Sequence, residues 1–290
     1  MIRRPKKGWF HTVALIAIGV ALVLYLIPIY WIIATSLKTR SDIFASPPKF
    51  IFKPTMRNYV ELIKPSSTTP EGKRIERESF YHRQLLNSVI IGFISTALAV
   101  GLGTMSAYAF SRFKVKGKGD MMFFILSTRM LPPVVVVIPL FLMYRTLGLF
   151  DTHIGLILLY TTFNVSFATW LMKGFIDEIP KEYEEAAMVD GYTRFKAFVK
   201  IVLPQAVTGI AATAVFCLIT AWNEFAFALI MTSKTARTAP PALASRMGAS
   251  GVAWGPIAAG AFIFLLPVVI FTFIMRKHLL RGVTFGAIKK

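Results

Sequence analysis

Long apolar stretches separated by charged segments dominate this chain. Apolar runs of roughly 20 residues have the length that an α-helix needs to cross a bilayer. Six such runs occur, at Thr12–Ser36, Asn87–Phe110, Met121–Tyr144, His153–Ile176, Gln205–Thr232 and Gly255–Met275. The first is too long for the core of a signal peptide and lacks a convincing cleavage site, so we expect it to be retained. The pattern predicts an all-α integral membrane protein with six transmembrane helices.

The composition supports a membrane protein and argues against several other classes. Of the 290 residues, 55% are hydrophobic and 16% are charged, whereas soluble domains carry about a quarter charged residues. The net charge of +19 lies between the apolar runs, which indicates loops at a membrane surface and no nucleic acid partner. The single cysteine, Cys217, excludes a disulfide framework. The four histidines lie on separate segments, so no metal site is predicted.

The distribution of Lys and Arg predicts the orientation. The segments 1–11, 111–120, 177–204 and 276–290 together hold 17 of these residues, and the short loops between them on the other side hold 4. The segment 37–84 adds ten more, but long loops count little in the positive-inside rule. Both termini are therefore predicted to be cytoplasmic.

The long segment 37–84 is predicted to lie outside the membrane on the opposite side from the termini. Thr55 can cap a short helix around Asn58, and Pro65–Gly72 has the composition of a flexible turn. The pattern favours a solvated connector with a small amphipathic helix that lies on the bilayer.

The segment 177–204 is predicted to form a helix, a glycine turn and a second helix. Residues 181–190 combine strong helix formers with acidic residues in the first turn, where the helix dipole favours negative charge. Gly191 ends this helix. A second helical stretch at 193–203 ends at Pro204, where the chain returns to the membrane.

The first of these helices carries a surface suited to docking. Glu184 and Glu185 form an acidic edge beside the small residues Ala186 and Ala187. Small residues allow another backbone to approach closely, and carboxylates offer partners to Lys or Arg. We therefore predict a docking element, with an amphipathic hairpin in the membrane interface as the alternative.

This segment resembles the EAA loop of bacterial ABC importer permeases over its full length. The matching positions are Glu185-Ala186-Ala187, then Gly191 after three residues, then Ile201-x-Leu203-Pro204 after nine more. Seven positions in one register over twenty residues rarely arise by chance.

Further stretches resemble the carbohydrate-uptake branch of that family, specifically the shorter maltose-type permease subunit. They are Ser36-Leu-Lys-Thr39, Pro47-Pro48, Asn58-Tyr59, Asn87-Ser88, Ala107-Tyr-Ala-Phe-Ser-Arg112, Ile138-Pro139, Gly148-Leu-Phe-Asp-Thr152, Ala221-Trp-Asn223 and Gly282-Val-Thr-Phe-Gly-Ala-Ile-Lys289. They follow the family's order along nearly the whole chain. The stretches Leu126–Pro132 and Arg281–Gly286 look more like the polyol members, which take sorbitol or mannitol.

The resemblance implies a type I ABC importer permease fold in the bacterial inner membrane. Residues 12–36 would form the first transmembrane helix, 37–84 a periplasmic loop and 85–275 the permease core. The implied assembly contains a second, different permease subunit and a dimer of ATPase subunits. A periplasmic or lipid-anchored binding protein would deliver a sugar or polyol. ATP and Mg would be bound by the ATPase, so this chain is expected to be non-catalytic and to hold no cofactor.

The resemblance also assigns roles to particular residues. The ATPase-coupling residues are Glu184, Glu185, Ala186, Ala187 and Gly191, and the residues that shape the return to the membrane are Ile201, Leu203 and Pro204. By the same analogy, the carboxyl tail touches the ATPase pair and the 233–254 loop reaches the binding protein. Gly117-Lys118-Gly119 lacks the spacing of a phosphate-binding P-loop, which agrees with a separate ATPase.

Ionisable groups inside a span usually face a cavity or a partner. We predict that Trp222, Asn223 and Glu224 line the outer part of the pathway. The alternative is that Trp222 belongs to the interfacial aromatic belt and that Glu224 reaches the headgroups. Arg129 is expected to bind backbone carbonyls rather than solute.

Straight helices would place Arg129 roughly 12 Å and Glu224 roughly 28 Å from the cytoplasmic side, which disfavours a salt bridge between the two. In the second span, the small residues Ala97, Gly101 and Ala107 are predicted to provide close helix packing.

Two other functions compete with that of a permease subunit. A secondary transporter driven by an ion gradient usually has discontinuous helices in matching halves, and here the pair Pro132-Pro133 predicts a break in the third span alone. A membrane-embedded enzyme needs clustered catalytic groups such as His-Glu-x-x-His, which the sequence lacks. Neither rival requires the helix–glycine–helix segment.

Overall fold

The computed structural model describes residues 9–64, 66–68, 74–76, 79–248 and 251–286. Its contacts divide the chain into two compact units. The first unit comprises Met1–Tyr81 and Ser245–Phe264, and the second comprises His82–Ala244 and Leu265–Lys290. The basic residues of the amino-terminal tail, Lys289 and Lys290 of the carboxyl-terminal tail and part of the predicted 65–72 turn lie outside the described residues.

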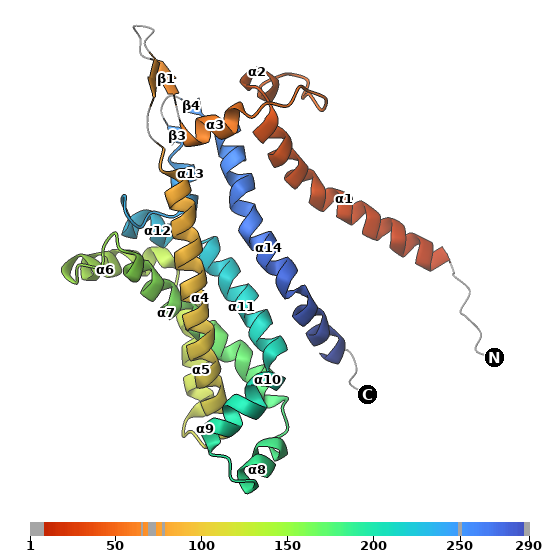
Figure 1. Cartoon of the computed structure of the whole chain (residues 1–290), viewed down its shortest axis with the longest axis vertical. Coiled ribbons are helices and arrows are strands. Elements are labelled where there is room, and N and C mark those ends of the chain that lie inside the picture. The colour runs from red at the N-terminus through yellow and green to blue at the C-terminus, as the bar shows by residue number, and fades with distance from the viewer. Residues whose placement is uncertain (1–8, 65, 69–73, 77–78, 249–250, 287–290) are drawn as a thin grey trace. The chain divides into compact units, whose positions relative to one another are not determined.

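Helices make up nearly all of the regular structure, which confirms the predicted fold class (Figure 1). In chain order they are α1 (Trp9–Leu37), α2 (Arg40–Ile43), α3 (Arg57–Ile63), α4 (Tyr81–Arg112), α5 (Lys118–Ser127), η1 (Thr128–Met130), α6 (Pro133–Thr146), α7 (His153–Asp177), α8 (Glu182–Val189), α9 (Arg194–Ala197), η2 (Phe198–Val202), α10 (Leu203–Gln205), α11 (Val207–Trp222), α12 (Ala226–Met231), α13 (Ala239–Ala244) and α14 (Trp254–Gly286). Two short antiparallel hairpins add β1 (Ser66–Thr68) with β2 (Arg74–Glu76), and β3 (Met247–Gly248) with β4 (Gly251–Val252).

Four of these helices are long and apolar enough to cross a membrane. They are α4, α7, the His11–Leu37 part of α1 and the Trp254–Arg276 part of α14. Two bent helix pairs raise the number to as many as six among the described residues, if each pair counts as one span. The pairs are Lys118–Met130 with Pro133–Thr146, bent by 90°, and Arg194–Gln205 with Val207–Trp222, bent by 75°.

The predicted break in the third span is confirmed. Leu131 and Pro132 have extended backbone angles, and Pro133 begins α6. A proline disfavours helical angles at the preceding residue and lacks the donor that a continuing helix needs. Two prolines in succession therefore stop η1 and start α6 in a new direction.

The fifth span differs from the continuous helix expected over Gln205–Thr232. Helix α11 ends at Trp222, and α12 begins at Ala226. The side-chain amide of Asn223 donates to the carbonyl of Ile219 at 2.9 Å. Glu224 accepts from the first N–H groups of α12, as described below. Polar side chains that satisfy backbone groups at helix ends stabilise an interruption, and apolar periodicity alone did not reveal it.

In the first unit, Asn58 caps the carboxyl end of α1. Its side-chain Nδ2 donates to the carbonyls of Ser36 and Lys38, each at 2.8 Å. Gly255 passes so close to this amide that an added Cβ would overlap Asn58. The α3 helix agrees with the predicted short helix. Met56 occupies its N-cap position, and the hydroxyl of Thr55 accepts from the N–H of Arg57, the first helical residue, at 3.2 Å.

In the second unit, α4 and α7 make a close approach. A Cβ added at Gly103 would lie 2.5 Å from the Cβ of Ala168. Of the small residues predicted to provide this packing, Ala107 is buried, whereas Ala97 and Gly101 are exposed in the chain. The prediction is therefore confirmed for Ala107, which packs in a cluster with Met172 of α7, and Ala97 and Gly101 lie outside the packing face within this chain. Cys217 is buried, in agreement with its predicted role as a small apolar residue.

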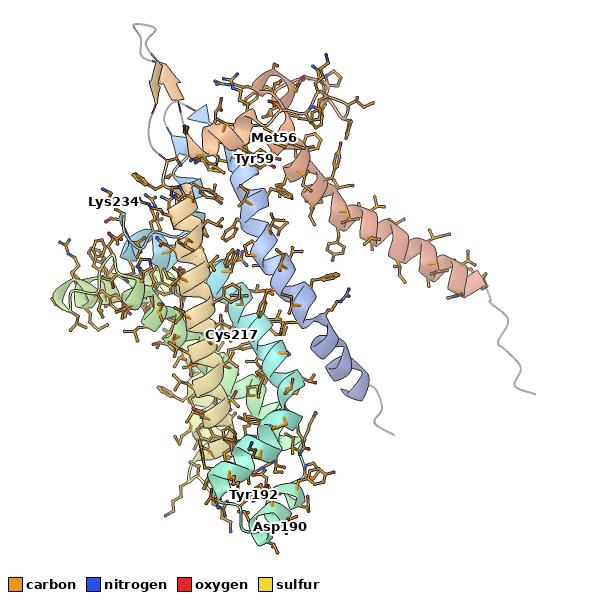
Figure 2. All side chains as sticks on the ribbon, in the orientation of Figure 1. Met56, Tyr59, Asp190, Tyr192, Cys217 and Lys234 are labelled. Atoms are coloured by element: carbon orange, nitrogen blue, oxygen red, sulfur yellow. The ribbon has the colours of Figure 1, made fainter. Side chains whose placement is uncertain are left out.

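The second unit separates two polar regions along its length. In Figure 2, Asp190 and Tyr192 lie at one end, Lys234 lies at the other, and Cys217 lies between them. The two polar regions are described separately below.

Candidate functional site

The α8 helix has a buried face and an exposed face. Glu184 and Ala187, three residues apart, are buried. Glu185 and Ala186 are exposed, and Val189 is 88% exposed. Residues three apart share one face of a helix, so the predicted acidic edge is divided. Glu184 faces the protein and Glu185 faces away from it.

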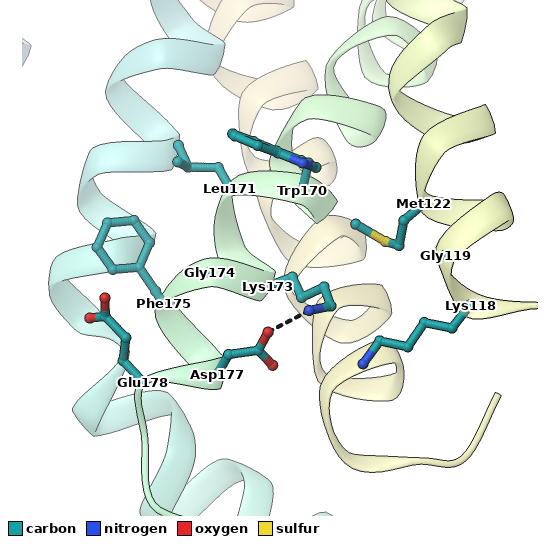
Figure 3. A pocket seen from close by; sticks show the side chains of 10 residues that line it. All are labelled: Lys118, Gly119, Met122, Trp170, Leu171, Lys173, Gly174, Phe175, Asp177 and Glu178. Carbon is teal, nitrogen blue, oxygen red and sulfur yellow. Dashed lines mark hydrogen bonds and ion pairs between the residues drawn. The ribbon is translucent and has the colours of Figure 1, made fainter.

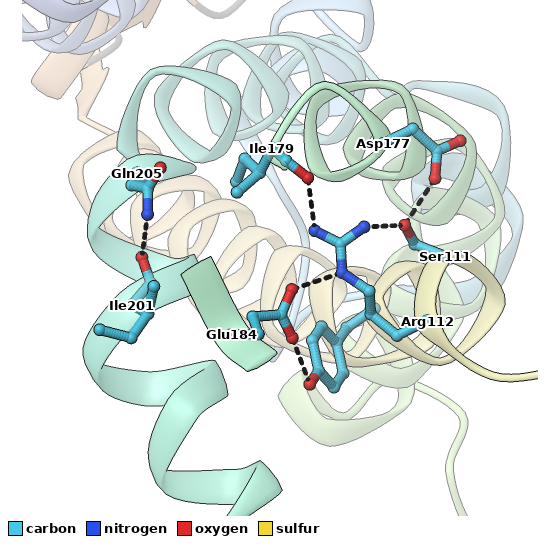
Figure 4. A network of polar contacts seen from close by, with 8 residues as sticks. Ser111, Arg112, Asp177, Ile179, Glu184, Ile201 and Gln205 are labelled. Atoms are coloured by element: carbon cyan, nitrogen blue, oxygen red, sulfur yellow. Dashed lines mark hydrogen bonds and ion pairs between the residues drawn. The ribbon is translucent and has the colours of Figure 1, made fainter. Parts of the chain in front are cut away.

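The buried face is attached to the end of α4 (Figure 4). Glu184 pairs through Oε1 with Nε of Arg112, and its Oε2 accepts from the hydroxyl of Tyr108 at 2.8 Å. The guanidinium also donates to the carbonyl of Ile179 at 2.8 Å. Ser111 donates to Asp177 at 2.5 Å. The network therefore joins the ends of α4 and α7 to α8.

Gly191 terminates α8 by adopting a left-handed backbone with φ +87°. Its N–H donates to the carbonyl of Met188 at 3.1 Å, and the N–H of Tyr192 donates to Ala187 at 3.0 Å. These bonds satisfy carbonyls that the helix end leaves free. Only glycine adopts this angle without a penalty, which explains the predicted helix–glycine–helix order.

The second helical stretch continues beyond its predicted end. Thr193 caps α9 by accepting from the N–H of Lys196 at 3.2 Å. A π-helical segment, η2, follows, and the chain remains helical through Pro204 to Gln205. Proline is tolerated here because it stands in the first turn of α10. The bend falls at Ala206 instead of Pro204.

The predicted residues Ile201, Leu203 and Pro204 are not the most buried part of this stretch. Ile201 and Leu203 are half-buried, and Pro204 is exposed. Val202 is fully buried in a cluster that includes Met172 of α7. Val202 is not among the positions that the resemblance assigns to this stretch.

A cavity of about 650 Å³ lies beside this network, between α5 and α7 (Figure 3). Lys118, Lys173, Asp177 and Glu178 bring two ammonium groups and two carboxylates to its wall, and Trp170 contributes an aromatic surface. Lys173 and Asp177 form an ion pair. Sequence reasoning did not identify this cavity because its residues come from two helices that are far apart in the chain.

A second cavity, of about 180 Å³, lies where the two interrupted spans meet. Glu224, Arg129, Tyr160 and Asn164 contribute to its lining. The carboxylate of Glu224 accepts from the hydroxyl of Tyr160 at 2.9 Å and from the N–H groups of Phe227 and Ala228 at 2.8 and 2.9 Å. It therefore caps α12 while lining the cavity.

The other predicted residues of this region have different surroundings. Trp222 is buried, and Asn223 is exposed in the chain. The guanidinium of Arg129 lies 4.9 Å from the centre of the Phe167 ring. The backbone carbonyls expected to bind Arg129 are not among its contacts within the described part of the chain.

At the opposite end of the second unit, Asp151 organises a loop. Its carboxylate accepts from the backbone N–H groups of residues 233–236 at 3.0 to 3.2 Å and from the Ser233 hydroxyl at 2.9 Å. Burial raises the pKa of Asp151, but these backbone donors lower it more strongly and hold it well below its usual range.

Asn87 completes this polar region. Its Nδ2 donates to the carbonyls of Thr235 and Arg237 at 2.9 and 3.0 Å. Its Oδ1 lies 2.8 Å from Nε2 of His153. Asn87 and Asp151 both belong to stretches that carry the resemblance to the permease family. In the structure, both side chains position the 233–239 loop. Among the described residues, no group of three or more His, Cys, Asp or Glu is arranged to hold a metal ion.

Comparison with known proteins agrees with this architecture. A family model described as "Binding-protein-dependent transport system inner membrane component" matches residues 99–284. The trehalose transport system permease protein SugB of Mycobacterium tuberculosis is 38% identical over 268 residues, covering 91% of this chain and 92% of that protein. The trehalose/maltose transport system permease protein MalG of Thermococcus litoralis is 31% identical, covering 95% of this chain and 96% of that protein.

A solved structure shares the fold. A chain of a bacterial ABC transporter involved in the import of the acidic polysaccharide alginate matches with a TM-score of 0.72 and 19% identity, covering 96% of this chain and 99% of that chain. The family match covers the core, both interrupted spans and α8. The chain therefore belongs to the inner membrane components of binding-protein-dependent transport systems, as a multi-pass, non-catalytic permease subunit of an ABC importer.

Proposed function

We propose that this chain forms half of the translocation pathway of an ATP-driven importer for a sugar or polyol. Its relatives SugB and MalG are named for trehalose and maltose transport, which supports a carbohydrate solute. The other components are a second, different permease subunit, an ATPase dimer that binds ATP and Mg, and a periplasmic or lipid-anchored binding protein.

We further propose that the ATPase docks on α8. The observation that carries this proposal is the division of α8 into a buried anchoring face and an exposed face. Glu185, Ala186 and Val189 present a carboxylate, a small residue and an apolar side chain to a partner. An arginine of the partner can pair with the carboxylate, while Ala186 lets its backbone approach.

Two substitutions test this docking. Glu185→Arg reverses the exposed charge, and Gly191→Leu strains the left-handed turn and adds bulk beside the docking face. In the complete importer reconstituted in liposomes, both should leave membrane insertion intact and uncouple ATP hydrolysis from uptake. Gly117→Leu is a matched control, since Gly117 also has a positive φ, +68°, with open space around its Cβ position.

The control separates strain from docking. A left-handed non-glycine residue costs about 1 to 3 kcal/mol at either position, so general destabilisation would affect Gly117→Leu and Gly191→Leu alike. Normal coupling in both Glu185→Arg and Gly191→Leu would refute the assignment of α8.

We propose that Glu224 lines the pathway, because it contributes to the lining of the smaller cavity. The pathway-lining role of Trp222 and Asn223 stays a prediction. Glu224→Gln keeps one acceptor oxygen for α12 and removes the charge. If the charge acts on the solute or on Arg129, uptake should fall in importers that still assemble with all their subunits. Unchanged uptake with normal assembly would restrict Glu224 to capping α12.

A further inference from the structure

The Arg112–Glu184 ion pair is far more enclosed than a surface pair. Its side chains are 5% and 7% exposed, whereas those of Lys173 and Asp177 nearby are 21% and 42% exposed. Removing two charges from water is costly and is offset only when both are fully hydrogen-bonded. Here each charge has further partners, because Glu184 also accepts from Tyr108 and Arg112 also donates to Ile179 and Ser111.

This pair connects α8 to two helices at once. Arg112 is the last residue of α4, and Ile179 follows the end of α7. Because Ser111 bonds to Asp177, the ends of both helices share the network with Glu184 (Figure 4). A displacement of α8 must therefore either move both helix ends or separate a buried ion pair.

The α4 and α7 helices are also joined to each other at four levels. Residues 87 and 153 bond through their side chains at 2.8 Å. Thr161 donates to the carbonyl of Ser95 at 3.5 Å. Gly103 fits closely against Ala168, and residues 111 and 177 bond at 2.5 Å. From one contact to the next, the residue number increases along α4 and along α7. The two helices therefore run parallel and are joined from one end to the other.

The end far from α8 holds the 233–239 loop. Asn87 of α4 donates to the carbonyls of Thr235 and Arg237, and the Ser88 hydroxyl accepts from the N–H of Ala239 at 2.9 Å. The same helix pair is thus attached to α8 at one end and to this loop at the other.

We propose that the Arg112–Glu184 pair is the joint that passes displacement of α8 to α4 and α7, which move as one body and shift the 233–239 loop. Arg112 and Glu184 are positioning residues in this scheme. The inference rests on the proposed docking of the ATPase to α8. It adds a defined route, a buried ion pair followed by a parallel helix pair, between that docking face and the opposite end of the second unit.

Spin labels at the two ends of this route test the proposal. Each test chain has one added cysteine that carries the label, either Glu182→Cys in the first turn of α8 or Lys234→Cys in the loop. Both positions are exposed, and the native Cys217 is buried. The complete importer in nanodiscs is measured by electron paramagnetic resonance before and after addition of ATP and Mg.

The response of a label is the change in its electron paramagnetic resonance spectrum when ATP and Mg are added. In the unsubstituted importer, both labels should show such a change. Glu184→Gln keeps the Tyr108 hydrogen bond and removes the charge of the pair, so the response at 182 should persist while the response at 234 falls at least tenfold. Arg112→Lys keeps the charge but lacks the planar guanidinium that reaches Ser111 and Ile179. It should give the same loss at 234.

A matched control alters an exposed pair. Glu61→Gln removes the partner of Arg57 on α3, and it should leave both responses unchanged. The charge-reversed double variant Arg112→Glu with Glu184→Arg, which retains opposite charges at the joint, should recover part of the response at 234.

The outcomes distinguish this proposal from the docking of the ATPase. A full response at 234 in both Glu184→Gln and Arg112→Lys, with normal assembly, would overturn the joint and leave the docking proposal intact. Absence of any response at 182 in the unsubstituted importer would overturn the docking proposal, and the joint with it.

Discussion

Replacing Asp151 by asparagine should open the 233–236 loop. The carboxylate receives all four backbone N–H groups of this loop. In Asp151→Asn, one oxygen becomes an NH₂ group that faces backbone donors. Net hydrogen bonds to charged groups contribute about 1.5 to 3 kcal/mol each. The loss of one or two such bonds lowers the free energy that favours the closed loop by about 3 kcal/mol. This shifts the equilibrium between closed and open loop toward the open form by roughly two orders of magnitude.

Hydrogen exchange followed by mass spectrometry measures this opening directly. The amides of residues 233–236 should lose roughly 100-fold in protection. Asp42→Asn is the control, because it removes a carboxylate from an exposed ion pair with Lys49, and it should leave these amides unchanged. Equal protection in Asp151→Asn and in the unsubstituted chain would show that the carboxylate does not hold the loop.

The pH dependence of this effect has a defined sign. Since the pKa of Asp151 is lower in the folded chain than in the unfolded chain, its stabilisation is complete above the unfolded value of about 3.9. It is lost as the pH falls through the folded value. The difference in protection between the unsubstituted chain and the Asp151→Asn variant should therefore stay constant from about pH 8 to pH 5 and begin to shrink below about pH 4.

Two further predictions concern close backbone approaches. Gly103→Ala places a Cβ 2.5 Å from that of Ala168 and should lower the free energy of unfolding by about 1 to 3 kcal/mol. Gly101 has open space around its Cβ position, so Gly101→Ala should leave the free energy of unfolding unchanged or raise it slightly. Thermal unfolding of the purified complex measures both, and equal unfolding temperatures would contradict the close contact. Gly255→Ala displaces the Asn58 amide from the end of α1 and should speed proteolysis after that helix; an unchanged cleavage rate would show that the cap tolerates the added methyl group.

The sequence predicted the helices and their order because a membrane imposes a simple rule. A span must be apolar over its length and must satisfy its own backbone. The signals of Gly191 and Pro132-Pro133 were equally direct and act where the pattern placed them, whereas the helix continues past Pro204 to Gln205. These features depend on local chemistry, and local chemistry can be read from one stretch of sequence.

The orientation of individual side chains could not be read in the same way. Glu184 and Glu185 are adjacent carboxylates in one motif, and only the position of Arg112, more than seventy residues earlier in the chain, decides which one is buried. The same limit explains Glu224. Its hydrogen bonds to Tyr160 and to α12 depend on a break in the fifth span that apolar composition conceals.

The cap on α1 also has a consequence for biosynthesis. Asn58 follows α1 closely in the chain, and Tyr59 adds a hydroxyl contact to Ser36 at 2.9 Å. The carboxyl-terminal end of α1 can therefore be capped as soon as this short following segment has been synthesised. Gly255 leaves the ribosome much later, after a delay on the order of 10 to 40 s at ordinary synthesis rates. During that interval the cap must persist without the glycine that finally covers it, and a chain truncated before Gly255 would carry this amide uncovered.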